Sequence, residues 1–275
     1  MIPQRALSLI ANQHQKDGGL RIPEAVIERD YCLAWFLTGL AGHPLRDTLA
    51  FKGGTALRRC WFADYRFSED LDFSLTQALS FDEICSGLDT IFAAVEEASG
   101  IRMAFDRQDR HGHQNTHTFY LRYQGPLPAA NDVKVDITIN ETLGFPLIER
   151  PLLRTYKNFS DLPEGATIRS YALEEIMVEK LVALTDRART EPRDLYDLDH
   201  LLDYTGVRFA DLQIELEAKL RFRNRSLDGL EAALTAKQPR LAKLWASRLG
   251  YQMSALPPFE AVFRRVQRAL REARL

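Results

Sequence analysis

Residues 51 to 73 read FKGGTALRRCWFADYRFSEDLDF, and this stretch decides the fold because it joins a glycine turn to a pair of carboxylates. The segment 48–51 before the glycines has strand character. Gly53 and Gly54 lack a Cβ atom, so the chain can turn sharply there and other groups can approach closely. A helix then begins at Thr55, and its N-terminus directs N–H donors and a positive dipole end at the turn. The turn therefore predicts a phosphate-binding site.

Alternation with a period of two runs through residues 69–75. Asp70 and Asp72 share one face of the predicted strand, while Leu71 and Phe73 share the other. Two carboxylates on one face can bind Mg²⁺, and such ions stabilise both the attacking and the leaving oxygen of a phosphoryl displacement. Alone, a glycine pair is usually an ordinary turn and two spaced aspartates are usually a solvated strand face. In this order and spacing they indicate nucleotidyl transfer.

A second alternating strand supplies the best third carboxylate. In the segment 132–139, Val133 and Val135 point to one face, while Lys134 and Asp136 point to the other. Asp136 could orient or deprotonate an attacking hydroxyl. The alternative is an ordinary exposed strand aspartate.

The other patterns predict a mixed sheet covered by helices. The apolar run 31–41 predicts a buried helix, and Ser80 with Glu83 forms a capping box that starts another helix. The segments 101–107 and 117–123 predict strands. We therefore expect an α/β (α+β) core.

Beyond Arg169 the pattern becomes helical, and Lys180 interrupts an apolar helical face. An unpaired ammonium is costly to bury, so this lysine must reach solvent, a carboxylate or a phosphate. If it binds phosphate, Lys180→Ala should leave the protein at least as stable as before. Pro192 begins the next helix, and Asp194 near its N-terminus could simply complement the helix dipole.

FKGGTAL followed by RFSEDLDF resembles the AbiEii family of nucleotidyltransferase toxins, within the DNA polymerase β-like nucleotidyltransferase superfamily. IERDYCL at 27–33 is similar to the family's opening helix. EKLVAL at 179–184 and RDLYDL at 193–198 resemble its third and fourth motifs. The resemblance runs from about Val26 to His200.

The resemblance implies a polymerase β-like nucleotidyltransferase core over residues 1–165 and a helical C-terminal domain over 166–275. It implies a catalytic set that consists of Asp70, Asp72, Asp136, Lys180 and Asp194. Asp197 is the alternative to Asp194 in this set. The expected metal is Mg²⁺ or Mn²⁺, held by Asp70, Asp72 and Asp136. The expected NTP-binding residues are Lys52, Gly53, Gly54, Thr55, Arg66, Ser68 and Lys180.

The resemblance also implies a toxin that moves NMP from an NTP to an acceptor hydroxyl, with release of pyrophosphate. The expected acceptor is RNA, specifically a tRNA 3′ end, and an antitoxin should be encoded nearby. An antibiotic nucleotidyltransferase of the aminoglycoside type is one alternative. A catalytically silent nucleotide-binding regulator is the other.

Composition agrees with a cytoplasmic protein. The chain has 275 residues, 45% of them hydrophobic, which is enough for real cores. The Met1–Arg5 start lacks the apolar region of a secretory signal. The longest apolar run is shorter than the roughly 20 residues that span a membrane. Three cysteines, without metal-ligand spacing, fit reduced thiols.

Charge is uneven along the chain. Residues 207–275 contain 14 Lys and Arg against 7 Asp and Glu, so they carry +7, and the remainder of a chain with net charge −2 carries −9. A basic part beside an acidic part suits a polyanionic substrate, although a solvated helical surface is the alternative. A cluster of His111, His113 and His117 lies in a polar loop without cysteine partners, so we do not expect a zinc site there.

Overall fold

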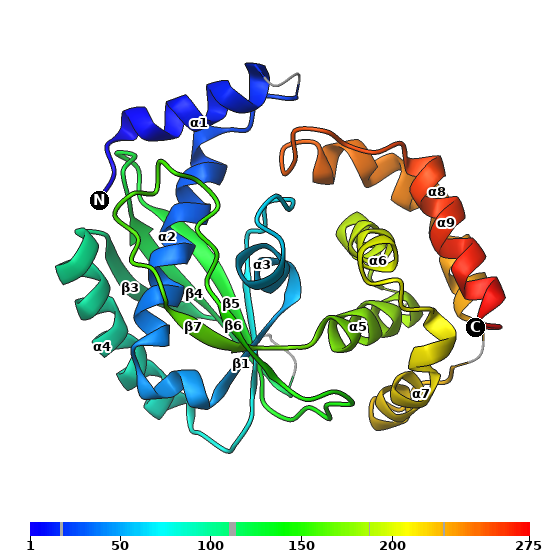
Figure 1. Ribbon diagram of the computed structural model, residues 1–275. Helices are drawn as coiled ribbons and strands as arrows, with labels where there is room; N and C mark the ends of the chain where they lie inside the picture. The colour runs from blue at the N-terminus through cyan, green and yellow to red at the C-terminus, as the bar shows by residue number, and fades with distance from the viewer. Residues whose placement is uncertain (17–18, 110–113, 187, 228) are drawn as a thin grey trace. The chain divides into compact units, whose positions relative to one another are not determined.

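The computed structural model describes residues 1–16, 19–109, 114–186, 188–227 and 229–275. The chain forms two compact units (Figure 1). The first unit comprises Met1–Glu141 and Leu147–Tyr171, and the second comprises Thr142–Pro146 and Ala172–Leu275. The sequence predicts a domain boundary near residue 165, whereas the first unit continues to Tyr171 because residues 167–170 form a strand of its sheet.

One mixed sheet organises the first unit, and within the described residues it contains seven strands in the order β3-β4-β5-β2-β1-β7-β6. The strands are β1 (Leu49–Lys52), β2 (Leu71–Leu75), β3 (Arg102–Gln108), β4 (Thr116–Gln124), β5 (Asn131–Thr138), β6 (Ile148–Pro151) and β7 (Thr167–Ser170). β2 pairs with β5 in parallel and with β1 antiparallel, while β1 also pairs with β7 in parallel. The predicted strands β1 to β5 are confirmed, and the mixed α/β fold class with them. β6 and β7 were not predicted.

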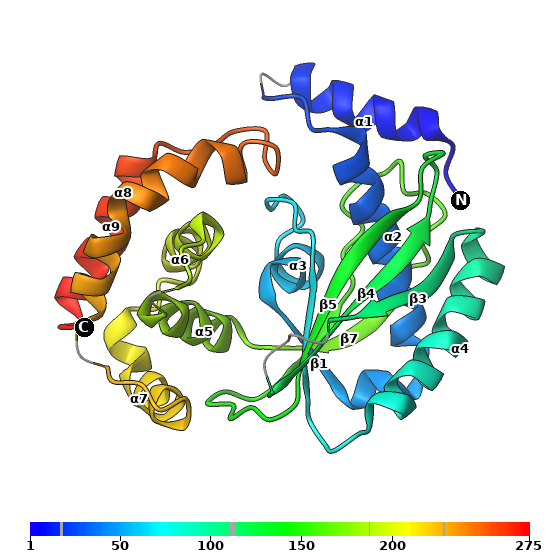
Figure 2. The same ribbon diagram turned by 180° about the vertical axis from the view of Figure 1, so that it is seen from behind.

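Helices cover this sheet (Figures 1 and 2). They are α1 (Gln4–Lys16), α2 (Glu24–Ala41), the short α3 (Gly53–Ala56) and α4 (Phe81–Ser99). The capping box predicted at Ser80 is present at the start of α4, and Gly100, with φ +76°, caps its C-terminus. α2 and α4 pack closely at Gly39, where a Cβ atom would lie 2.7 Å from Val95 Cγ2. The apolar faces of both helices join the strands in the core of the first unit.

The second unit is helical, apart from the short segment 142–146. Its helices are α5 (Leu173–Thr185), α6 (Pro192–Thr205), α7 (Gln213–Phe222), α8 (Leu230–Leu249) and α9 (Phe259–Glu272). Glu175 accepts hydrogen bonds from the backbone N–H groups of Gly144 and Phe145, and it forms an ion pair with the buried Lys219. These bonds explain why 142–146 belongs to the helical unit. Across the described part of the chain, no helix combines the length and hydropathy needed to cross a membrane.

Candidate active site

Gly53 follows directly after β1 and is required for two independent reasons. Its φ is +76°, a backbone region that side chains with Cβ rarely adopt. A Cβ atom on Gly53 would also lie 2.3 Å from Asp72 Oδ2. This contact follows from strand pairing, since Lys52 faces Asp72 across β1 and β2. The glycine turn therefore lies against one of the predicted metal-binding carboxylates.

At Gly54 the same turn lies against two more residues that are predicted to bind the NTP. A Cβ atom on Gly54 would lie 2.7 Å from Arg66 Nη2 and 2.9 Å from Ser68 Oγ, and both of these side chains are buried. The Thr55 hydroxyl donates to the backbone carbonyl of Asp70, which ties the turn to β2. The predicted phosphate-binding residues of the first unit are thus brought together around one turn.

We expect Gly53→Ala to reduce activity strongly, because its Cβ would displace the Asp72 carboxylate as well as strain the backbone. Gly165→Ala is a matched control: Gly165 has φ +85°, but nothing lies within 4 Å of a Cβ there. Both variants should lose about 1 kcal/mol of stability from the backbone conformation alone. Denaturant unfolding and NMP transfer would be measured for both. Equal activity in the two variants would contradict the close approach to Asp72.

Lys52, the last residue of β1, also lies beside this turn. Its ammonium donates to Thr138 Oγ1 at 3.0 Å and lies 5.5 Å from the centre of the Tyr171 ring. Its predicted contact with NTP remains a prediction.

Asp136 lies beside the aspartate pair because β5 runs parallel to β2, with Asp72 and Asp136 as direct partners. Asp136 accepts hydrogen bonds from Thr118 Oγ1 and Lys134 Nζ, both at 2.6 Å. Burial lowers the pKa of Lys134, but the hydrogen bond and charge of Asp136, with the charges of Asp70 and Asp72, raise it above its usual value. All three aspartates therefore raise the pKa of the same ammonium group, that of Lys134.

Lys134 is the site residue that sequence reasoning missed as a functional group. The alternating pattern had already placed it on the face of Asp136, and that was the available signal. A cation among three carboxylates offsets their mutual repulsion when no metal is bound.

The carboxylates fit a metal that arrives with its substrate. Within the described ranges, no group of three or more His, Cys, Asp or Glu side chains could hold a metal ion by itself. Mg²⁺ in nucleotide enzymes is typically bound by one or two carboxylates plus substrate phosphates. Asp70 and Asp72, next to a turn that is predicted to bind phosphate, fit this arrangement. Asp136 is engaged by Lys134 and Thr118, so its role as a third metal ligand remains a prediction.

A buried network of ion pairs holds the segment that follows the glycine turn. The chain continues from α3 into a π-helical segment, Leu57–Trp61, and Arg58 in this segment forms a two-point ion pair with Asp30 of α2 at 2.9 and 3.1 Å. The Arg58 guanidinium also lies 3.9 Å from the centre of the Phe67 ring. Phe67 precedes Ser68, so the network fixes the loop that carries Ser68. Such networks cannot be recognised from sequence because their partners are far apart in the chain.

In the second unit, Lys180 lies between two buried carboxylates. Its ammonium is 2.7 Å from Asp194 Oδ1 and 2.8 Å from Asp197 Oδ2. Arg189 pairs with Asp194 as well, at 2.7 Å. Burial raises the pKa of Asp194, but Lys180 and Arg189 outweigh it and lower that pKa to about 2. The sequence left solvent, a carboxylate or a phosphate as the partner of Lys180. The structure shows a carboxylate contact, and both candidate acids, Asp194 and Asp197, make it.

This pairing changes the stability expected for a Lys180 variant. Replacing Lys180 with alanine would leave two buried carboxylates without this partner, so the ion pairs favour a less stable variant over the equally stable one expected from the sequence. Of the histidine cluster, His117 lies in β4 with its ring 5.0 Å from that of Phe81. His111 and His113 lie outside the described residues.

A glycine turn in contact with a carboxylate-bearing strand, in a mixed sheet, is the arrangement that the sequence predicts for a nucleotidyltransferase. Residues 35–270 match the family model for the nucleotidyl transferase AbiEii toxin of type IV toxin–antitoxin systems. The chain therefore belongs to the AbiEii family of nucleotidyltransferase toxins. The match extends well beyond His200, where the resemblance seen in the motifs ended.

The fold is also similar to that of MenT4, a nucleotidyltransferase toxin from Mycobacterium tuberculosis H37Rv. The TM-score is 0.53 at 19% sequence identity, over 87% of this chain and 82% of that chain. No curated protein sequence matches this chain. Membership of the family implies an NTP substrate and a cognate antitoxin.

Proposed function

We propose that this toxin transfers NMP from an NTP to the 3′-hydroxyl of an RNA, with tRNA as the expected acceptor, and depends on Mg²⁺ or Mn²⁺. One observation carries the proposal: the backbone of Gly53 lies against the Asp72 carboxylate, and Asp136 is the direct neighbour of Asp72 on the adjacent strand. A triphosphate held at the turn would thereby have its phosphates next to carboxylates.

In this reaction the turn and its neighbours hold the triphosphate. The N–H groups after Gly53 and Gly54, the Ser68 hydroxyl and the Arg66 guanidinium would contact phosphate oxygens. A divalent metal held by Asp70 and Asp72 would neutralise charge that develops on the phosphates. Asp136, positioned by Lys134 and Thr118, would orient the acceptor hydroxyl. Lys180 and Asp194 remain proposed members of the site.

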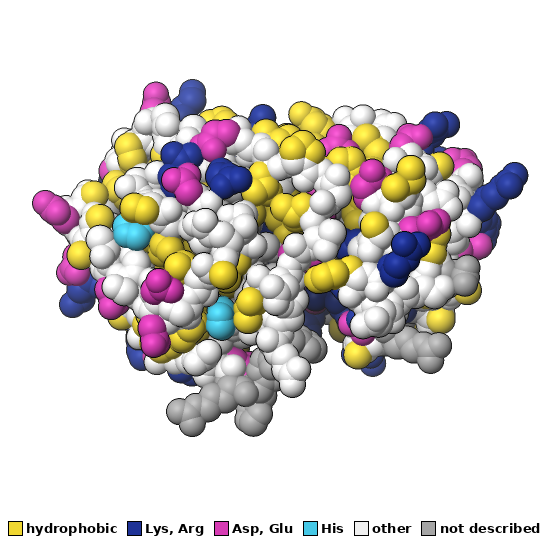
Figure 3. Space-filling model, turned by 90° about the horizontal axis from the view of Figure 1, so that it is seen from below, with side chains coloured by type: hydrophobic (Ala, Val, Ile, Leu, Met, Phe, Trp, Pro, Cys, Tyr) yellow, Lys and Arg dark blue, Asp and Glu magenta, His cyan; other side chains and the backbone are white. Residues whose placement is uncertain are grey.

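RNA is favoured over a cationic antibiotic by the +7 charge of residues 207–275. Part of this charge is neutralised, because arginines such as Arg223, Arg225 and Arg265 pair with acidic side chains of the second unit that lie outside residues 207–275. Figure 3 accordingly shows a face on which basic and acidic side chains are mixed. Net charge, and not one basic patch, therefore supports the RNA proposal. An RNA acceptor would also place the protein in the cytoplasm.

The acceptor can be tested directly. The protein would be incubated with Mg²⁺, each α-labelled NTP, and either total cellular RNA or a panel of aminoglycosides. We expect label in RNA of tRNA size, suppressed by EDTA and decreasing steeply between about 50 and 200 mM salt. Label on aminoglycosides alone would identify an antibiotic-modifying enzyme. Label on neither would contradict the RNA proposal and favour a silent regulator.

A further inference from the structure

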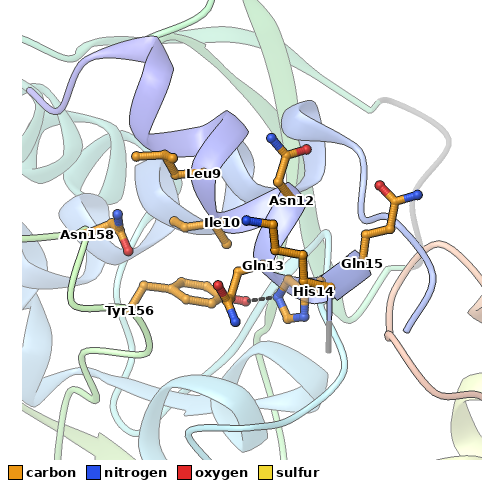
Figure 4. A pocket seen from close by; sticks show the side chains of 9 residues that line it. Leu9, Ile10, Asn12, Gln13, His14, Gln15, Tyr156 and Asn158 are labelled. Carbon is orange, nitrogen blue, oxygen red and sulfur yellow. Dashed lines mark hydrogen bonds between the residues drawn. The ribbon is translucent and has the colours of Figure 1, made fainter. Parts of the chain in front are cut away.

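One cavity of the first unit has no role in the reaction described above. Its volume is about 710 Å³, and it is formed by α1 and the segment that contains Tyr156 and Asn158 (Figure 4). The polar side chains that line it include those of Asn12, Gln13, His14, Lys16, Tyr156 and Asn158.

The chemistry of this lining suits an uncharged, flat and polar ligand. Carboxamides such as those of Gln13 and Asn158 carry both donors and an acceptor, as do the edges of nucleobases. Tyr156 adds an aromatic ring on which a base can stack. Among the described residues, the lining contains Lys16 and no acidic side chain, so these residues would not repel a phosphate next to the base.

The cavity is linked to the phosphate-binding turn through one aromatic side chain. His14 Nε2 is 2.9 Å from the Tyr156 hydroxyl (Figure 4), and the Phe67 ring packs against both rings, with centroids 6.3 Å from His14 and 6.5 Å from Tyr156. Phe67 is followed by Ser68, which lies against Gly54. The Phe67 ring therefore separates a ligand in the cavity from Ser68 and the glycine turn.

We propose that this cavity binds one nucleobase of the single-stranded 3′ end of the RNA acceptor, a few nucleotides from the hydroxyl that reacts. The inference rests on the proposed RNA acceptor. It assigns Gln13 and Asn158 to reading the base edge and Tyr156 to stacking. The cavity would thus determine which RNA ends place their hydroxyl at the site.

A thermodynamic cycle between protein and RNA tests this contact. Binding of a short fluorescent single-stranded RNA with a 3′-hydroxyl would be measured by anisotropy, without NTP or metal. An abasic site would be introduced at each of the last few positions in turn. The protein variants are Gln13→Ala combined with Asn158→Ala, and the control Gln4→Ala, which removes an exposed carboxamide from the same helix outside the cavity.

We expect one abasic position to weaken binding to the unchanged protein by about 5-fold or more. The double variant should bind intact RNA with a similar loss and show little further loss at that abasic position. Gln4→Ala should behave like the unchanged protein. Circular dichroism melts of all variants check that the fold is retained.

Equal abasic penalties in the double variant and the unchanged protein would overturn the inference. So would variants that raise the KM for NTP but leave RNA binding unchanged, because the cavity would then hold the base of the NTP. If RNA is labelled by NMP but the cycle shows no coupling, the proposed function stands and this inference fails. If RNA is neither bound nor labelled, both fail.

Discussion

Asp72→Asn should lower the rate of NMP transfer by roughly 10² to 10³-fold, because losing a carboxylate that is proposed to hold the metal would remove about 3 to 4 kcal/mol of transition-state stabilisation. Folding should change little. Asp72 is partly exposed, and its loss relieves repulsion among carboxylates that share Lys134. Transfer assays and thermal melts of the same preparation measure both effects. The same result is expected for Asp70→Asn.

Asp64→Asn is the matched control, since Asp64 is an exposed aspartate between the turn and β2. It should retain both activity and stability. EDTA should stop the reaction of the unchanged protein, and added Mg²⁺ or Mn²⁺ should restore it. An active Asp72→Asn variant, or one that does not fold, would remove the argument for a metal site at this pair.

Lys180→Met should destabilise the protein by about 3 to 5 kcal/mol, the cost of removing one partner from a buried ion pair. Asp194 and Asp197 would be left buried, with Arg189 as a partner of Asp194. Urea unfolding measures the loss. Adding Asp197→Asn to Lys180→Met should recover part of it, because one buried charge is then removed. Full stability of Lys180→Met with a raised KM for NTP would instead assign this lysine to phosphate binding.

Acid titration provides a second test of the same ion network. The pKa of Asp194 is lowered in the folded protein to about 2 from its usual 3.8. The carboxylate therefore contributes about 2 kcal/mol of stability above pH 4, and this contribution is lost as the pH falls towards 2. An Asp194→Asn variant should lack this part of the pH dependence. The slopes of stability against pH for the two proteins would be compared between pH 2 and 5.

The sequence alone was sufficient for features that arise from neighbouring residues. Alternation placed Asp70 and Asp72 on β2 and Asp136 on β5, and the capping box at Ser80 marked the start of α4. These signals are local because side-chain direction in a strand, and N–H bonding at a helix start, depend only on residues a few positions apart. The glycine pair likewise marked the turn, and the motifs identified the family.

Only the tertiary structure decided which distant groups meet. β7 was not predicted because it is short, and its pairing with β1 joins Phe51 to Ser170 across more than a hundred residues. The position of Lys134 among three aspartates depends on the register between β2 and β5. The partners of Lys180 depend on how α5 packs against α6. Pairing of this kind is set by packing over the whole unit, and periodicity along the chain carries no information about it.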